Sequence, residues 1–158
     1  MCPSRRVALR GLVGLAGGGM LMLPGCLEED SNEDCPALPN EPDYAGWLDN
    51  TSNYRHTCDF RGEDLVVVSV GVRANQAYWG FRPPAVAVSP GTTVRWEWTG
   101  RGGPHDVEED RSRFDSGRPV GNDTETFTVE FDDPGAFKYF CAPHRSAGMK
   151  GVVFVTVE

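Results

Sequence analysis

The sequence predicts an all-β domain, and three observations lead to that prediction. Glycine and proline are abundant, with 19 and 12 residues among 158, which is typical of a fold with many turns. Several short segments are rich in β-branched and aromatic residues, which favour strands. Turn signals separate these segments, as at Pro90-Gly91 and at Asp132-Asp133-Pro134-Gly135.

The first expected strands lie before residue 90. Residues 65–72 form a strand rich in valine. Residues 76–81 are a short aromatic segment, in which we expect Phe81 to pack in the core. Pro83 and Pro84 follow and force extended backbone, so residues 85–89 are expected to form another short strand.

The clearest alternation is in residues 92–99. Val94, Trp96 and Trp98 fall on one face and Arg95 and Glu97 on the other, as in a half-buried strand. We therefore expect the two tryptophans to pack in the core rather than to relay electrons. The same alternation predicts strands in the remaining segments, which are residues 124–131, 137–140 and 150–157.

The loop between the last two expected strands carries three potential metal ligands. Its sequence is Cys141-Ala142-Pro143-His144-Arg145-Ser146-Ala147-Gly148-Met149. A thiolate and a thioether combined with imidazoles select copper, and two histidines with one cysteine and a weak axial methionine form a blue-copper site. His105 can supply the second imidazole. We therefore predict a mononuclear copper site made of His105, Cys141, His144 and Met149.

This ligand pattern resembles that of plastocyanin-type cupredoxins, and residues 44–158 as a whole resemble the halocyanins, small blue copper proteins of haloarchaea. The shared segments are Gly46-Trp47-Leu48, Pro83-Pro84-Ala85-Val86, Pro90-Gly91-Thr92-Thr93-Val94, Trp96-Glu97-Trp98-Thr99-Gly100, His105 and the loop from Cys141 to Gly151. The resemblance implies a cupredoxin-type Greek-key β-sandwich of about eight strands. It also implies one-electron transfer by a copper ion that cycles between Cu(I) and Cu(II), in a protein that is not an enzyme.

The resemblance also implies how the ligands act. The family binds copper through Nδ1 of both histidines, here His105 and His144. The ring edge of His144 is expected at the surface, among the small residues Ala142, Pro143, Ala147 and Gly148, where redox proteins would dock. Arg145 lies beside this patch, so it would either steer an acidic partner or simply be solvated.

Asp106 departs from the pattern, because many relatives carry asparagine after the first histidine ligand. An asparagine can donate hydrogen bonds that brace the ligand loops, whereas a carboxylate cannot donate. We expect the negative charge to favour oxidised copper and so to lower the reduction potential.

Other functions use the same donors. A copper carrier or scavenger at the cell surface would bind the metal without transferring electrons. Zinc is a weaker alternative, because methionine is a poor zinc ligand. An oxidase or nitrite reductase would need more copper ligands, and the third histidine, His56, is expected to be a solvated loop residue.

The charge of the chain excludes some partners. The formal net charge is −8, and removal of a leader that contains Arg5, Arg6 and Arg10 leaves 12 basic against 23 acidic residues, or −11. Binding to nucleic acid needs lysines and arginines facing phosphate, so nucleic acid is not an expected partner. No motif for a small-molecule substrate is present. The acidic run at residues 108–110 is expected to be a solvated loop, with contact to a basic patch of a partner as the alternative.

The N-terminal region predicts export and anchoring. Residues 1–25 combine twin arginines, a short apolar run and small residues, which resembles a Tat signal peptide with a lipobox. Cys26 would then become the lipidated first residue and hold the protein on the outer face of the cell membrane. Residues 26–43 are expected to form an acidic flexible linker, and residues 44–158 the copper-binding domain.

Two of the five cysteines have no place in the leader, the lipobox or the metal loop. These are Cys35 and Cys58. Outside the cell such a pair is most simply a disulfide, which would tie the linker to the start of the domain. Spacing leaves free thiols open as the alternative.

Overall fold

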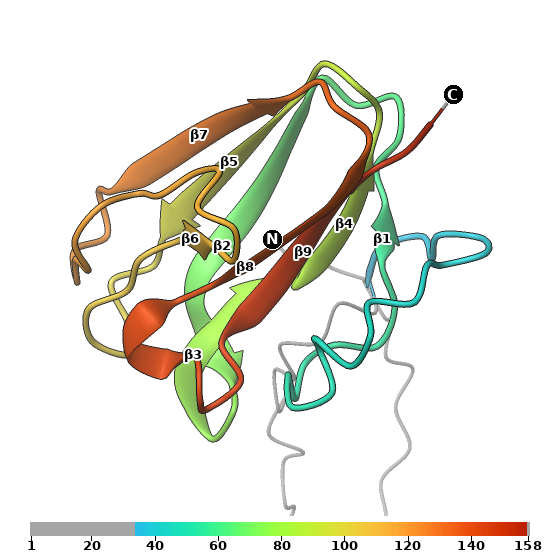
Figure 1. The fold of residues 1–158 in the computed structure, drawn as a ribbon. Helices are drawn as coiled ribbons and strands as arrows, with labels where there is room; N and C mark the ends of the chain where they lie inside the picture. The colour runs from blue at the N-terminus through green and yellow to red at the C-terminus, as the bar shows by residue number, and fades with distance from the viewer. Residues whose placement is uncertain (1–33, 158) are drawn as a thin grey trace, which may run out of the picture.

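The computed structural model describes residues 34–157, and these fold into a sandwich of two β-sheets (Figure 1). The expected leader and Cys26 lie outside the described residues. The nine strands of the described chain are β1 (Cys58–Asp59), β2 (Leu65–Ala74), β3 (Ala77–Arg82), β4 (Ala85–Val88), β5 (Thr92–Trp98), β6 (Glu108–Glu109), β7 (Thr126–Phe131), β8 (Gly135–Phe140) and β9 (Lys150–Val155).

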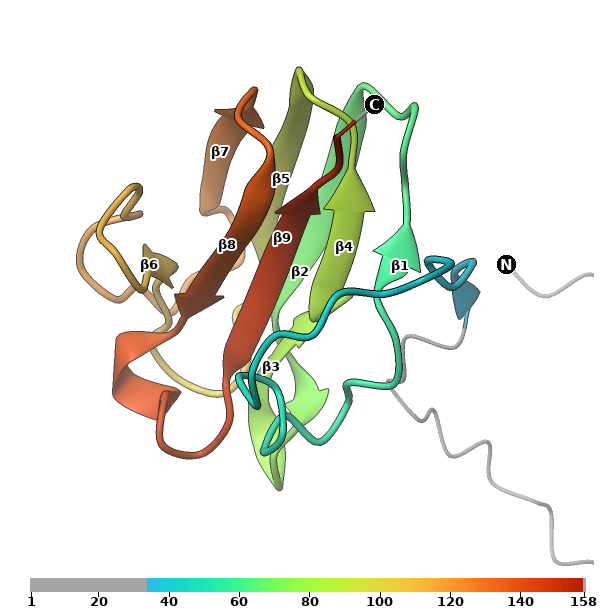
Figure 2. The same ribbon diagram turned by 45° about the vertical axis from the view of Figure 1, so that its right-hand side comes forward.

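The two sheets face each other in Figure 2. One has the order β1-β4-β9-β8-β6 and the other has the order β3-β2-β5-β7. Both mix parallel and antiparallel pairs: β4 runs parallel to β9, and β2 runs parallel to β5. Strands distant in sequence are thus neighbours in space, and the predicted cupredoxin-type sandwich is confirmed.

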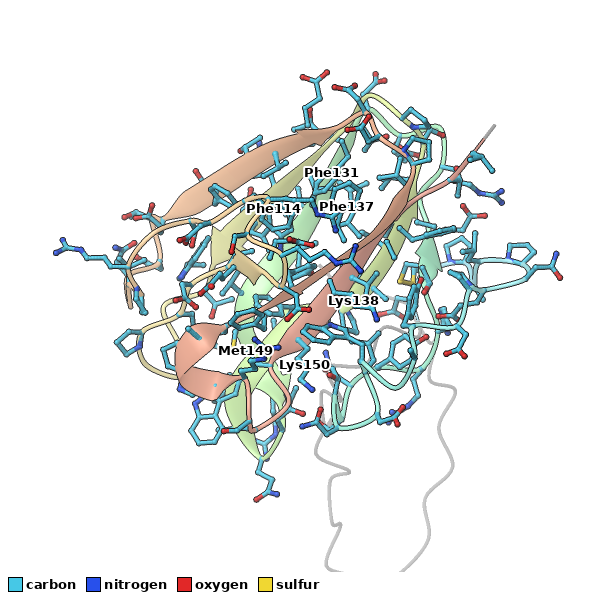
Figure 3. All side chains as sticks on the ribbon, in the orientation of Figure 1. Phe114, Phe131, Phe137, Lys138, Met149 and Lys150 are labelled. Atoms are coloured by element: carbon cyan, nitrogen blue, oxygen red, sulfur yellow. A yellow bond between two sulfur atoms is a disulfide. The ribbon has the colours of Figure 1, made fainter. Side chains whose placement is uncertain are left out.

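The core lies between the sheets, and alternation along the strands produces it. In β5 every second residue is buried, so Val94, Trp96 and Trp98 face the core as expected. Trp96 lies at the centre of an aromatic cluster and packs against Phe114, Phe127, Phe131 and Tyr139. Figure 3 shows Phe114, Phe131 and Phe137 together in this core.

One expectation about the acidic run is wrong. Residues 108–109 form the short strand β6, which pairs with β8, and the Glu109 side chain is only 1% exposed. Its carboxylate binds the Arg113 guanidinium and the backbone N–H groups of Arg111 and Arg113. Burial of this carboxylate is possible because these donors satisfy it.

The structure joins Cys35 and Cys58 by a disulfide. Backbone hydrogen bonds reinforce the link, from Leu38 N–H to Thr57 O and from Asp59 N–H to Pro36 O. Residues 36–38 lie in the stretch expected to be a linker, and here they contact the domain beside β1. Within residues 34–157, no helix is long and apolar enough to cross a membrane.

Candidate metal centre

His105 is positioned by the loop that follows β5. Its backbone exchanges two hydrogen bonds of 2.9 Å with Val120, and its carbonyl accepts a third from Trp98 Nε1. The imidazole Nε2 lies 2.7 Å from the carbonyl oxygen of Arg101. Because a carbonyl only accepts, Nε2 must carry the proton, so Nδ1 presents a free lone pair.

The second loop joins β8 to β9 and carries the other three predicted ligands. It contains the 3-10 helix η2 (Ala142–His144). The Cys141 N–H donates to Met149 O at 3.0 Å, and the Met149 N–H donates to His144 O at 3.1 Å. These bonds fold the loop on itself, so its ligands sit on a compact turn held at both ends by strands.

Three of the donors converge. Cys141 Sγ lies 3.6 Å from His105 Nδ1 and 3.5 Å from His144 Nδ1, and the two Nδ1 atoms are 3.2 Å apart. The sulfur and the two nitrogens therefore form a small triangle of potential metal ligands. The structure brings together residues 36 positions apart in sequence, as the ligand pattern predicts.

Met149 is fully buried in the same loop, and Figure 3 shows it beside the ribbon of that loop. Cys141 is also fully buried and His105 is 1% exposed, whereas His144 is only half-buried. The centre is thus closed to solvent on most sides, and the His144 imidazole lies nearest to the surface.

Burial sets the protonation of the metal-free centre. It raises the pKa of the Cys141 thiol to about 12, since a thiolate would be poorly solvated there. Burial also lowers the pKa of His105 and of His144, and for His144 the neighbouring His105 adds to the effect. Both imidazoles are therefore held neutral, the form that binds metals, and metal binding must displace the thiol proton.

This donor set fits one copper ion. Two neutral imidazole nitrogens and a buried thiol meet within 4.8 Å of one another, and a buried thioether belongs to the same loop. Thiolate with imidazole suits copper or zinc, and the thioether favours copper. The four side chains occur in a dry site on two loops, and that combination is difficult to explain by packing alone.

Asp106 braces the two loops as a hydrogen-bond acceptor. It is 4% exposed, and its Oδ1 accepts a hydrogen bond of 2.6 Å from the Ala142 N–H. A carboxylate cannot donate a hydrogen bond, but the ligand loop offers a backbone N–H from which it can accept one.

The surface around His144 partly matches expectation. Ala142 and Pro143 are exposed, but Gly148 is buried against the backbone of Asn50. The Arg145 guanidinium forms a salt bridge of 2.7 Å with Asp110 and lies over the Phe140 ring. Arg145 is therefore anchored rather than freely solvated.

Sequence reasoning missed two other contacts of the centre. Trp79, from β3, stacks on the His144 ring with centroids 4.8 Å apart. Thr51 donates through Oγ1 to the Gly148 carbonyl in the ligand loop. Neither residue has a spacing that signals such a role; the only cue was the aromatic character of residues 76–81.

The described residues contain one more group of potential ligands, formed by Cys35, His56 and Cys58. Both sulfurs are engaged in the disulfide. His56 is half-buried, and its Nε2 lies 3.2 Å from the Cys35 carbonyl and 3.5 Å from Cys35 Sγ. The expectation of a solvated His56 is therefore wrong, because the N-terminal segment folds over it.

Comparison with known proteins agrees with the site. Residues 66–156, more than half of the chain, match the family of copper-binding proteins described as plastocyanin/azurin. A halocyanin of Natronomonas pharaonis is 46% identical over 100 residues, which cover 61% of this chain and 60% of that protein. A plastocyanin of Scenedesmus fuscus is 32% identical over 97 residues, covering 56% of this chain and 98% of that protein. The resemblance to halocyanins is confirmed.

Among solved structures, a mutant plastocyanin of a fern aligns with a TM-score of 0.47 and 26% identity. The alignment covers 58% of this chain and all of the fern protein.

Proposed function

The chain belongs to the plastocyanin/azurin family of copper-binding proteins, and from this premise we propose that it carries single electrons between redox proteins. The observation that carries the proposal is the convergence of Cys141 Sγ with Nδ1 of both His105 and His144 in a buried site. One bound copper ion would supply the Cu(I)/Cu(II) couple.

We assign the ligands as follows. Cys141 binds as the thiolate, and His105 and His144 bind through Nδ1. Met149 would offer its thioether as a weaker fourth donor, which would help to set the reduction potential. The hydrogen bond from His105 Nε2 to Arg101 O supports the assignment of Nδ1 as the metal-binding atom of His105, because it leaves the Nδ1 lone pair free.

The surroundings of the site suit electron transfer better than catalysis. Four protein donors leave no open coordination position for a substrate. The ligand loops are held by strands, by their internal hydrogen bonds and by the link from Asp106 to Ala142, so the donors keep their places when the charge changes. This rigidity lowers the rearrangement that accompanies each transfer.

The half-buried His144 is the proposed exit for electrons. Exposed Ala142 and Pro143 lie next to it in η2 and present little bulk or charge, so a partner can approach closely. The partners would be redox proteins that dock briefly on this face. Neither nucleic acid nor a small-molecule substrate is proposed.

Voltammetry of the copper-loaded protein tests the proposal. We expect a reversible one-electron wave with fast exchange at the electrode, which a Cys141→Ser variant lacks. A protein that binds copper tightly, exchanges electrons slowly and hands the metal to an acceptor would instead be a copper carrier.

We further propose that the protein is exported by a Tat signal and anchored through a lipid on Cys26. The twin arginines and the residues before Cys26 support this proposal. In the native host, the protein should fractionate with membranes and be released by detergent, and a Cys26→Ala variant should enter the medium. Equal membrane retention of both forms would count against a lipid anchor.

A further inference from the structure

The indole of Trp79 covers one face of the His144 imidazole. The rings are nearly parallel, with an interplanar angle of 16° and centroids 4.8 Å apart. Trp79 comes from β3 of one sheet and His144 from η2, in the loop between two strands of the other. The stack therefore connects the two sheets at the end of the sandwich that holds the ligands.

Trp79 is itself held in place from two sides. Its Nε1 donates a hydrogen bond of 3.1 Å to Gly102 O, and its carbonyl accepts one of 2.7 Å from Asn75 Nδ2. Asn75 belongs to the tight turn between β2 and β3, where Asn75 and Gln76 both have positive φ. A ring fixed in this way can restrain another ring that lies against it.

The two histidines are restrained differently. A metal-binding histidine usually donates its second ring N–H to an acceptor, which fixes the orientation of the ring. His105 follows this rule through Arg101 O, whereas among residues 34–157 the structure gives the His144 ring hydrogen-bond contacts only through Nδ1. The His144 ring contacts two other rings: it lies tilted by 58° against the His105 ring, and Trp79 is the ring that stacks on its face.

We propose that Trp79 is the positioning residue of His144. Its indole holds the imidazole plane so that Nδ1 stays directed at Cys141 Sγ and at the metal. The Trp79 indole donates to the Gly102 carbonyl, and the carbonyl of the preceding residue, Arg101, accepts the Nε2–H of the His105 ring. Trp79 therefore also couples the His144 ring to the loop that carries His105. This role rests on the proposed copper site and refines it.

Two substitutions separate the stack from the hydrogen bond. Trp79→Phe keeps an aromatic face but loses the bond to Gly102, and Trp79→Leu loses both. Trp47→Leu is the matched control, because Trp47 is also half-buried and also donates through Nε1 to a backbone carbonyl, that of Gly151. Trp47 stacks on neither histidine ligand.

The first readout is the release of copper to a chelator. We expect Trp79→Leu to speed release by about three- to tenfold, the range that a lost aromatic pair allows. Trp79→Phe and Trp47→Leu should stay within about twofold of the parent protein. Equal release rates for Trp79→Leu and the parent would overturn the proposal, as would a Trp79→Phe variant as fast as Trp79→Leu.

The second readout is proton NMR of the histidine rings in the metal-free and Cu(I) forms. The indole ring current should shift the His144 ring protons upfield, and this shift should disappear in Trp79→Leu. If that variant does not fold, the parent protein still decides: His144 ring protons without an upfield shift would overturn the proposal. Because the metal-free form also reports the stack, this result is distinct from any failure of copper binding.

Discussion

Asp106 accepts a hydrogen bond of 2.6 Å from the Ala142 N–H, and this bond joins the loop that carries His105 to the loop that carries Cys141 and His144. Asp106 is buried and follows His105 in sequence, and its partner Ala142 lies between Cys141 and His144 in the ligand loop. It therefore brings a negative charge to the centre and also braces the loops.

Substitution of Asp106 separates these two effects. In Asp106→Asn the side-chain oxygen can still accept from Ala142, but the charge is gone. We expect the reduction potential, measured by voltammetry, to rise by about 40–130 mV, because a nearby negative charge stabilises oxidised copper by on the order of 1–3 kcal/mol in a partly buried site.

Asp106→Ala is the companion variant, since it removes both the charge and the brace. We expect a similar rise in potential, together with faster loss of copper. An unchanged potential in Asp106→Asn would contradict the electrostatic role, and unchanged copper retention in Asp106→Ala would contradict the brace.

Gly102→Ala should disrupt the loop that positions the His105 imidazole. A Cβ at Gly102 would lie 2.2 Å from the carbonyl oxygen of Tyr78 and 2.9 Å from His105 Nε2, so the loop would have to move. We expect a large loss of copper affinity and a destabilisation of at least about 2 kcal/mol, measured by copper titration and urea unfolding.

Gly103→Ala is the matched control for this clash. Gly103 also has positive φ, but a Cβ there meets no atom within 4 Å. Its substitution should cost only about 1 kcal/mol of backbone strain and leave the copper site in place. Equal damage from both variants would show that strain, not the contact with His105, is responsible.

The ion pair between buried Glu109 and partly exposed Arg113 should make stability depend on pH. Burial alone would raise the pKa of Glu109, but the Arg113 guanidinium and the backbone N–H groups of Arg113 and Arg111 together hold the pKa below its usual value. The folded state then binds this proton less readily than the unfolded state. The contribution to stability is thus present above pH of about 4.5 and is lost as the pH falls through the lowered pKa.

Glu109→Gln tests this dependence in the metal-free protein. At neutral pH we expect a loss of about 2 kcal/mol, less than for a fully buried pair because Arg113 is 39% exposed. Below pH of about 4.5 the difference from the parent should shrink. Glu108→Gln is the control, and thermal unfolding curves from neutral to acid pH measure both. A constant difference at all pH values would contradict the assignment.

Removal of the disulfide should weaken the fold and spare the site. Cys35 and Cys58 are 23 residues apart, and a loop of that length contributes about 3 kcal/mol in the chain-entropy account. We expect Cys35→Ala/Cys58→Ala to lose about that amount in urea unfolding. Its visible spectrum should be unchanged, because Cys58 lies in the edge strand β1, and β4 separates β1 from β9 and β8, the two strands that the ligand loop joins. A changed copper spectrum would contradict this separation.

The sequence predicted the elements that follow simple patterns. Alternation in residues 92–99 gave β5 and its buried face, and donor chemistry singled out the cysteine and two histidines that converge. The observed strand ends differ from the predicted ones by a few residues, because backbone pairing rather than composition determines where a strand ends. The ligand loop could be predicted because a cysteine, a histidine and a methionine this close in sequence are typical of a copper site.

What escaped prediction depends on contacts between distant segments. Glu109 looked solvated because its partner Arg113 could not be foreseen to fold back on it. His56 looked exposed because nothing in the sequence around it shows that Cys35 lies against its ring. Trp79 differs in no local feature from a core aromatic residue, and only the approach of the two sheets places it on His144.

The visible spectrum of the copper-loaded protein, recorded before and after ascorbate, tests the central claim most directly. We predict an intense blue band from Cys141 thiolate bound to Cu(II), which bleaches on reduction, returns on re-oxidation and is absent from Cys141→Ser. A protein that binds copper but shows no such band would contradict the claim that this centre is a blue-copper electron carrier.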